Sequence, residues 1–219
     1  MHLGVLGTGV VGNTIGTKLA QSHDVMMGSR SAGNEKAESW AKAAGPKASA
    51  GTFADAARFG ELLFNCVRGA SSLEALEMAG EENLEGKVLV DLANPLDFSK
   101  GIPMLTVCND DSLGERIQKR FPRARVVKAL NTMNCSVMVN PGLVPGDHNV
   151  FLSGSDAEAK KKVRELLREA FGWKESNILD LGDITTARGA EMLLPMWIRL
   201  YGAFGHANFN WHLAVAGKP

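Results

Sequence analysis

The stretch Gly7-Thr8-Gly9-Val10-Val11-Gly12 decides the fold of this 219-residue chain. It follows a short apolar run, His2 to Leu6, and opens a segment in which Ile15 and Leu19 recur at helical spacing. In such a GxGxxG motif the first glycine permits a tight turn, the second lets a pyrophosphate approach the backbone, and the third lets the helix pack closely. The sequence therefore predicts a dinucleotide site at the amino terminus of a helix.

Short apolar runs alternate with helical segments along the rest of the chain. Further strands are predicted at residues 24–27, 48–50, 62–66, 87–91, 125–130, 149–153 and 177–181. Helices are predicted at residues 34–44 and 186–209, the second with a kink at Pro195. This alternation predicts an α/β fold with a Rossmann-like, doubly wound and mainly parallel sheet.

Three serine–glutamate pairs have the spacing of a capping box, in which each side chain satisfies a free amide at a helix start. These pairs are Ser71 with Glu74, Ser112 with Glu115, and Ser155 with Glu158. We expect two units: a dinucleotide-binding Rossmann domain over residues 1–141, and a smaller C-terminal α/β lobe over residues 142–219 that ends in helices and packs against it.

Composition excludes several classes of protein. Lysine plus arginine and aspartate plus glutamate both number 24, so the formal net charge is zero and no global field favours nucleic acid or an anionic membrane. Apolar residues make up 45%, as in a packed globular domain. No export signal or membrane-spanning run is recognised, and three scattered cysteines suit a reducing compartment, so we expect a cytoplasmic protein.

The end of the second predicted strand lacks an acidic residue. NAD-binding proteins usually place a carboxylate there to hold the ribose 2′-hydroxyl, whereas this chain reads Gly28-Ser29-Arg30. A guanidinium forms a fork that matches a phosphate, and a serine hydroxyl can donate to it. With Lys36 as a second cation, Ser29 and Arg30 predict NADP(H) rather than NAD(H).

Other strand ends point to the same crevice, because ligands bind beyond the carboxyl ends of parallel strands. The residues expected near the nicotinamide half of the dinucleotide are Cys66, Val67, Arg68, Ala93, Asn94, Asn131 and Cys135. For Asn94 and Asn131 a second reading is equally open, in which they are turn residues that satisfy local backbone groups.

No catalytic residue is predicted. The chain shows no nucleophile elbow, and its five histidines lack metal-ligand spacing, so no metal site is predicted either. Tyr201 is the only tyrosine, which removes a Tyr-x-x-x-Lys reductase mechanism. Hydride transfer between two organic cofactors needs no general acid; it needs two rings held together and water excluded. An apolar C-terminal cap with methionine and tryptophan suits that chemistry.

The chain resembles the coenzyme F420-dependent NADP oxidoreductases, and its nucleotide domain is similar to the cytosolic part of the six-transmembrane metalloreductases. Thr8 to Val11 matches the phosphate loop of the family, Gly28-Ser29-Arg30 its 2′-phosphate segment, and Glu35 to Glu38 the segment that carries its lysine. Residues 129–135 correspond to a stretch that lines the nicotinamide, and residues 187–195 to the C-terminal helix pattern.

The resemblance implies an oxidoreductase that passes a hydride between NADP(H) and a flavin-like acceptor, with coenzyme F420 as the acceptor of the family. The residues expected to contact the acceptor are Asn134, Met196, Trp197 and Phe209. The chain departs from the family at Cys66-Val67-Arg68-Gly69, where the family has Pro-Trp, and at Asn134-Cys135, where it has Pro-Ala.

Two other functions remain open: reduction of a small imine or carbonyl oriented by Asn131 or Asn134, and NADP(H) sensing without turnover. Met192, Met196 and Trp197 also fit a buried core or a seam between subunits, since they recur at helical spacing. We expect a homodimer, because the C-terminal helix carries more apolar surface than a small lobe buries.

Overall fold

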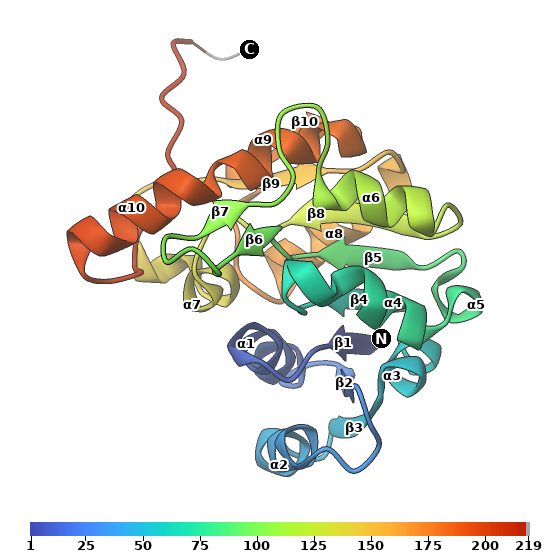
Figure 1. Cartoon of the computed structure of the whole chain (residues 1–219). Coiled ribbons are helices and arrows are strands. Elements are labelled where there is room, and N and C mark those ends of the chain that lie inside the picture. The colour runs from blue at the N-terminus through green and yellow to red at the C-terminus, as the bar shows by residue number, and fades with distance from the viewer. Residues whose placement is uncertain (218–219) are drawn as a thin grey trace.

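In the computed structural model, which describes residues 1–217, eight strands form one sheet in the order β10-β9-β8-β5-β4-β1-β2-β3 (Figure 1). The strands are β1 (His2–Leu6), β2 (Asp24–Ser29), β3 (Ala48–Thr52), β4 (Leu62–Asn65), β5 (Val88–Asp91), β8 (Arg125–Ala129), β9 (Val150–Ser153) and β10 (Ile178–Gly182). Every neighbouring pair is parallel except β8 with β9. The prediction of a Rossmann-like, mainly parallel α/β fold is confirmed.

Helices cover both faces of this sheet. They are α1 (Val10–Leu19), α2 (Glu35–Ala44), α3 (Phe53–Phe59), α4 (Ser72–Ala79), α5 (Glu81–Leu84), α6 (Leu113–Arg120), α7 (Cys135–Val139), α8 (Ala157–Glu169), α9 (Ala187–Met192) and α10 (Leu194–Phe204). One core packs α1, α2, α7 and α8 on one face, and a second packs α3, α4, α6 and the start of α9 on the other.

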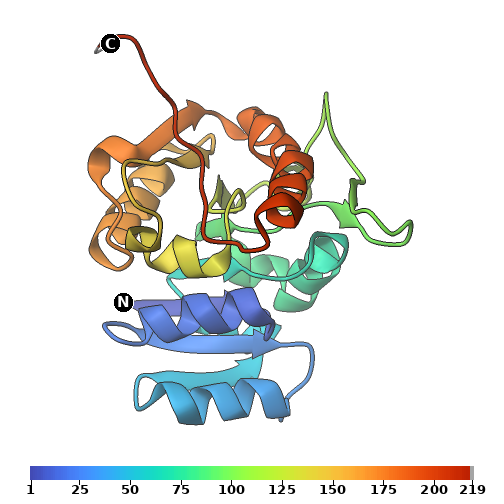
Figure 2. The same ribbon diagram turned by 90° about the vertical axis from the view of Figure 1, so that its left-hand side faces the viewer.

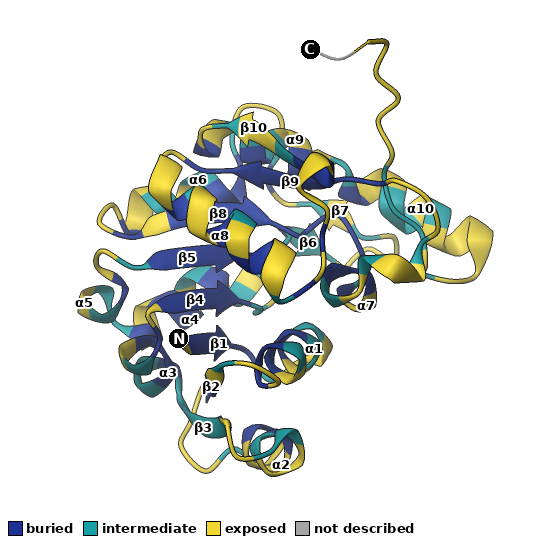
Figure 3. Ribbon diagram, turned by 180° about the vertical axis from the view of Figure 1, so that it is seen from behind, coloured by how far each residue is buried: buried dark blue, intermediate teal, exposed yellow. Residues whose placement is uncertain are grey.

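Alternate strand residues enter the two cores. Val5, Phe64 and Val90 lie in the first core, whereas their neighbours Leu6, Leu63 and Leu89 lie in the second. These inner strands are therefore apolar on both faces, as expected where helices cover a parallel sheet. Figure 3 shows the result: the inner strands are buried, whereas the edge strands β3 and β10 and the outer sides of the helices are more exposed.

Strand register places the predicted site residues along one edge. Leu6 lies opposite Gly28 on one side and Asn65 on the other, Asn65 lies opposite Asp91, and Asp91 opposite Lys128. The loops that follow β1, β2, β4, β5 and β8 therefore leave the sheet at the same edge. This edge is the one at which ligands bind in open α/β sheets.

Residues after 141 add to the same sheet. Lys128 pairs with Ser153 and Ala129 with Leu152, so β9 attaches to β8, and β10 then pairs with β9. Figure 2 shows this part of the chain above α1 and α2, together with the C-terminal segment that crosses it. The boundary at residue 141 stays a prediction.

Two helix starts differ from the sequence expectation. The Ser71 side chain makes no capping hydrogen bond, because a 3-10 turn over Gly69–Ser71 precedes α4. The cap of α8 is Asp156 and not Ser155: its carboxylate accepts from the Ala159 amide at 2.7 Å. Ser112 does cap α6, because its hydroxyl accepts from the Glu115 amide at 3.1 Å.

The C-terminal helix is broken rather than kinked. α9 ends at Met192, and Pro195 lies in the first turn of α10, where its missing amide costs nothing. α10 ends at Phe204, before Gly205, whose φ of +69° closes the helix. The prediction that the helix continues to residue 209 is therefore wrong. Within residues 1–217, no helix has the length and apolarity needed to cross a membrane.

Replacing Asp156 by alanine is expected to lower the free energy of unfolding by about 1 kcal/mol, because α8 loses its N-cap. The matched control is Ser155→Ala, whose hydroxyl makes only a 3.4 Å contact with the Ile184 amide. Urea denaturation of both variants measures the difference. Equal losses in the two variants would contradict the assignment of Asp156 as the cap.

Candidate functional site

The loop between β1 and α1 has the geometry that a pyrophosphate requires. Gly7 has φ of +120°, and its amide donates to the Gly28 carbonyl at 3.0 Å, which joins the loop to β2. A Cβ on Gly12 would collide with the Gly7 carbonyl oxygen, so only glycine lets α1 start this close to the loop. A Cβ on Gly9 would meet no atom within 4 Å. The open space over Gly9, at the N-cap of a ten-residue helix, fits a phosphate group.

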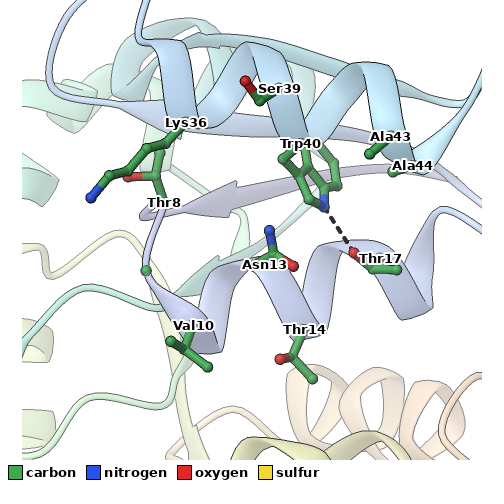
Figure 4. A pocket seen from close by; sticks show the side chains of 11 residues that line it. Thr8, Val10, Asn13, Thr14, Thr17, Lys36, Ser39, Trp40, Ala43 and Ala44 are labelled. Carbon is green, nitrogen blue, oxygen red and sulfur yellow. Dashed lines mark hydrogen bonds between the residues drawn. The ribbon is translucent and has the colours of Figure 1, made fainter.

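A cavity of about 540 Å³ runs from this loop into the groove between α1 and α2 (Figure 4). Thr8, Gly9 and Lys36 line one end of it, and Trp40 lines the wall on α2. The Trp40 indole nitrogen donates to the Thr17 hydroxyl at 3.0 Å, so the two helices are fixed to each other. The lysine that the sequence predicts as a 2′-phosphate ligand is therefore beside the phosphate loop.

Ser29 and Arg30 lie where the second strand ends. Ser29 is buried, and its hydroxyl donates to the Ser31 carbonyl at 2.7 Å, so it shapes the loop that carries Arg30. Arg30 and Lys36 are both exposed, and neither forms an ion pair with another residue between 1 and 217. Two free cations thus flank the end of β2, while the role of Ser29 as a phosphate ligand stays a prediction.

Asn94 and Asn131 join the loops after β5 and β8. The Asn94 side-chain amide donates to the Asn131 carbonyl, and the Asn131 side-chain amide donates to Asn94 Oδ1, both at 2.9 Å. Asn131 is 2% exposed. The Asn94 side chain thus bonds local backbone, and the two side chains bond each other. Both line a cavity at this edge of the sheet, where Asn131 Oδ1 is buried without a partner among residues 1–217. These bonds support the reading of Asn94 and Asn131 as turn residues, whereas their contact with a nicotinamide stays a prediction.

The loop after β8 carries a backbone conformation that the sequence does not signal. Leu130 is buried and has φ of +65°, a region that L-residues with bulky side chains rarely adopt. It lies directly before Asn131, at the edge where the predicted nicotinamide residues gather. Strain of this kind is commonest at functional sites.

Two cavities meet at this edge. The larger, of about 950 Å³, extends from Cys66–Ala70 after β4 to the hairpin of β6 (Leu96–Asp97) and β7 (Met104–Leu105). The smaller, of about 290 Å³, is lined by residues of α7 and α10. Both are lined by Val11, Leu92 and Asn94, so they adjoin over the start of α1.

Two free cysteines, Cys66 and Cys135, lie at this site. Burial raises the pKa of the Cys66 thiol well above its usual range, with Asp91 adding to the effect, so the thiol stays protonated. Cys135 is buried at the start of α7, and its sulfur lies 3.6 Å from the Thr14 hydroxyl of α1. Among residues 1–217, no group of three or more histidine, cysteine, aspartate or glutamate side chains could hold a metal ion.

The residues expected to contact the acceptor are only partly brought together. Trp197 and Asn134 line the smaller cavity, and Trp197 stacks on Phe209 with ring centroids 5.3 Å apart. Met196 is 56% exposed and does not line either cavity at the sheet edge. Their contact with an acceptor, like the homodimer predicted from the apolar surface of α10, stays a prediction.

Comparison with known proteins identifies the family. Residues 2–95 match the family model described as NADP oxidoreductase, coenzyme F420-dependent. A crystal structure from Arthrobacter sp. FB24, assigned as an F420-dependent NADP-reductase, is 52% identical and superposes with a TM-score of 0.91 over 97% of this chain and 99% of that one. The chain belongs to the coenzyme F420-dependent NADP oxidoreductase family. It is an NADP-dependent oxidoreductase.

Two curated relatives are more distant from this oxidoreductase. The F420-dependent NADP reductase of Methanocaldococcus jannaschii is 29% identical over 91% of this chain and 92% of its own length. The rat metalloreductase STEAP3 is also 29% identical, but the chain spans only 37% of its length. A reductive aminase from Aspergillus terreus, at 20% identity and a TM-score of 0.65, shares the fold.

A buried ionic cluster lies beneath the site of this NADP oxidoreductase, and no sequence motif indicates it. The Lys128 ammonium lies 2.6 Å from Asp91 Oδ2, 2.7 Å from Glu191 Oε1 and 2.6 Å from the Ala93 carbonyl oxygen. Glu191 also accepts hydrogen bonds from the Leu113 and Gly114 amides, at the start of α6. This cluster joins β5, β8, α6 and α9 directly below the loops that carry Asn94 and Asn131.

Proposed function

We propose that this protein binds NADP(H) across the start of α1 and transfers a hydride between it and a flavin-type acceptor, of which coenzyme F420 is the one named for the family. The observation that carries the proposal is the end of β2. Arg30 and Lys36 are free cations there, beside a phosphate loop with open space over Gly9, and no carboxylate occupies the place that NAD-binding proteins reserve for one.

Different residues along the sheet edge bind different parts of the dinucleotide. The backbone from Gly7 to Gly12 supports binding of the pyrophosphate at a helix amino terminus. Arg30 and Lys36 select the 2′-phosphate, and Ser29 holds the loop that carries Arg30. Cys66, Val67, Ala93, Asn94, Asn131 and Cys135 surround the space in which the nicotinamide half would lie.

For hydride transfer, this protein needs mainly to hold the nicotinamide and the acceptor ring in position and to exclude water. Bound NADPH would supply the hydride, and a flavin-type acceptor would take it up together with a proton from solvent. The Cys66 thiol stays protonated, and no histidine lines the cavities at the sheet edge. Asn94 and Asn131 instead line the smaller cavity, and their mutual hydrogen bonds fix the position of both side chains.

Replacing Arg30 by alanine is expected to raise the Kd of NADPH about 10- to 100-fold and to leave the Kd of NADH within about twofold, because only NADPH loses a charge-assisted bond to phosphate. Isothermal titration with both nucleotides measures the change. Arg58→Ala is the matched control, since Arg58 is an exposed arginine of α3 that pairs only with Asp55. If the unmodified protein bound both nucleotides equally, or if Arg30→Ala changed neither affinity, the proposed selection of NADP(H) would be wrong.

A further inference from the structure

The segment that follows α10 is bound to the body of the protein, although it forms neither a helix nor a strand. The Asn149 amide donates to the Trp211 carbonyl at 2.7 Å, and the Leu213 amide donates to Asn149 Oδ1 at 3.0 Å. The Asn210 side-chain amide donates to the Asn149 carbonyl at 3.0 Å. Asn149 directly precedes β9 and is 8% exposed, so this segment is tied to a buried residue. We refer to residues 208–213 as the C-terminal strap, part of the segment that turns back after α10 in Figure 2.

His148 holds the strap through a second buried side chain. Its Nε2 atom lies 3.0 Å from the Pro141 carbonyl oxygen, which can only accept, so Nε2 carries a hydrogen. Its Nδ1 atom accepts from the Asn210 side-chain amide at 2.8 Å. Both hydrogens of that amide are thereby used, one on His148 and one on Asn149. The path of the strap is therefore fixed by hydrogen bonds to two adjacent buried residues.

The strap contacts two walls of the smaller cavity at the sheet edge. The Trp211 indole nitrogen donates to the Thr132 carbonyl at 3.0 Å, and Thr132 lies in the loop after β8 between two residues that line this cavity. Phe209 stacks on Trp197, which lines the cavity from α10, with ring centroids 5.3 Å apart. No residue of the strap itself lines the cavity. The strap therefore joins the loop to α10 without occupying space that a ligand would use.

Neither wall is held firmly by its own element. Of the eleven residues of α10, only Leu194 is buried, so little packing fixes the position of that helix. In the loop, Leu130 has φ of +65°, a conformation that persists only where surrounding contacts impose it. The Thr132 hydroxyl is buried without a partner among residues 1–217, so it adds no restraint. The contacts of Trp211 and Phe209 supply restraint at both places.

We propose that the C-terminal strap is a positioning element: Trp211 holds the loop after β8, Phe209 holds Trp197, and together they fix the width of the smaller cavity. The inference rests on the proposed binding of NADP(H) across this edge, with the nicotinamide half at this end and the 2′-phosphate at Arg30. Trp211 is a positioning residue that no sequence motif marks. Phe209 acts through Trp197 and needs no contact with an acceptor. Loosening the strap should therefore weaken binding of the nicotinamide half of the ligand and not of the adenosine half.

The test compares NADPH with 2′-phospho-ADP-ribose, which has the same adenosine, 2′-phosphate and pyrophosphate but no nicotinamide. Trp211→Phe removes the indole N–H and keeps an aromatic ring. Once the bond to Thr132 is lost, binding of NADPH must also order the loop, which lowers the apparent affinity. We expect the Kd of NADPH to rise about three- to tenfold and the Kd of 2′-phospho-ADP-ribose to stay within about twofold, both measured by isothermal titration.

Phe209→Leu is a second variant, which acts at the other wall and keeps apolar volume. It should raise the Kd of NADPH to a similar degree. His212→Ala is the matched control, because His212 neighbours Trp211, is exposed, and its side chain forms no hydrogen bond with another residue between 1 and 217. This control should leave both affinities within about twofold. Thermal unfolding shows that each variant is folded at the titration temperature, and either strap variant suffices for the test.

An equal loss of affinity for both ligands would indicate general loosening of the fold and would overturn the positioning role, as would unchanged NADPH affinity in the folded strap variants. Equal affinity of the unmodified protein for NADPH and 2′-phospho-ADP-ribose would also overturn it, because the nicotinamide would then contribute nothing at this edge. In that case, weaker binding of both ligands in Arg30→Ala would still support the selection of NADP(H). No affinity of the unmodified protein for either ligand would overturn both proposals.

Discussion

Replacing Lys128 by methionine is expected to lower the free energy of unfolding by about 3–5 kcal/mol, the usual cost of removing one partner from a buried ionic cluster. The Lys128 ammonium is completely buried and lies within 2.7 Å of both Asp91 and Glu191. Methionine fills similar volume but leaves two carboxylates facing each other without a counter-charge. The loss is measured by urea denaturation at pH 7.

The contribution of the Lys128 cluster to folding stability depends on pH, and its direction follows from the pKa of Lys128. Burial, the largest single influence, lowers the pKa of Lys128, but Asp91 and Glu191 together outweigh it and raise the pKa above its ordinary value. The folded protein thus holds this proton more tightly than the unfolded chain does. Its contribution to stability is complete below the unfolded pKa of about 10.4, and is lost as pH rises through the folded pKa. On the alkaline side, the stability difference between wild type and Lys128→Met should therefore persist until the pH rises past the unfolded pKa of about 10.4.

Lys174→Met is the matched control for this substitution. Lys174 also pairs with a carboxylate, that of Asp147 at 2.8 Å, but the two side chains are 69% and 61% exposed. Exposed pairs contribute about 0–1 kcal/mol. A loss in Lys128→Met no larger than that in Lys174→Met would show that the buried cluster does not hold the fold together.

Local signals in the sequence predict most of the fold. Each inner strand is a short apolar run because helices cover both of its faces, so the strands at residues 62–65 and 88–91 can be predicted from local sequence alone. The hairpin of β6 and β7 cannot be predicted in this way. Each of its strands has two residues and no apolar alternation, and its place over the sheet edge depends on contacts made after folding.

The candidate site also contains residues that local sequence predicts and residues that it does not. The phosphate loop and Arg30 follow from motifs, because their function depends on neighbours in sequence. The roles of Lys128 and Glu191 do not follow from motifs, because charged residues of these types usually lie at the surface and only tertiary contacts bury them here. The cap of α8 shows the same limit between two neighbouring residues. Ser155 and Asp156 are both good cap residues, and the sequence alone does not tell which of them caps the helix.

The glycines of the phosphate loop are expected to separate binding from folding. Gly12→Ala should destabilise the protein and abolish NADPH binding together, since the new methyl group would overlap the Gly7 carbonyl, which is backbone and has little freedom to move. Because folding and binding are lost together, the Gly12→Ala result alone cannot show that a ligand lies over the loop. A substitution at Gly9 can show it.

Gly9→Ala should leave the thermal unfolding temperature within about 2 °C of wild type, because φ of −76° suits alanine and its Cβ would meet no atom of the protein. The same methyl group would occupy the space assigned to the pyrophosphate. Overpacking of this kind costs about 1–3 kcal/mol, which corresponds to roughly a 5- to 150-fold increase in the Kd of NADPH. Calorimetric unfolding and NADPH titration on one preparation give both values. Unchanged NADPH affinity in a stable Gly9→Ala protein would place the dinucleotide elsewhere, and the roles of Arg30 and Lys36 would then have no support.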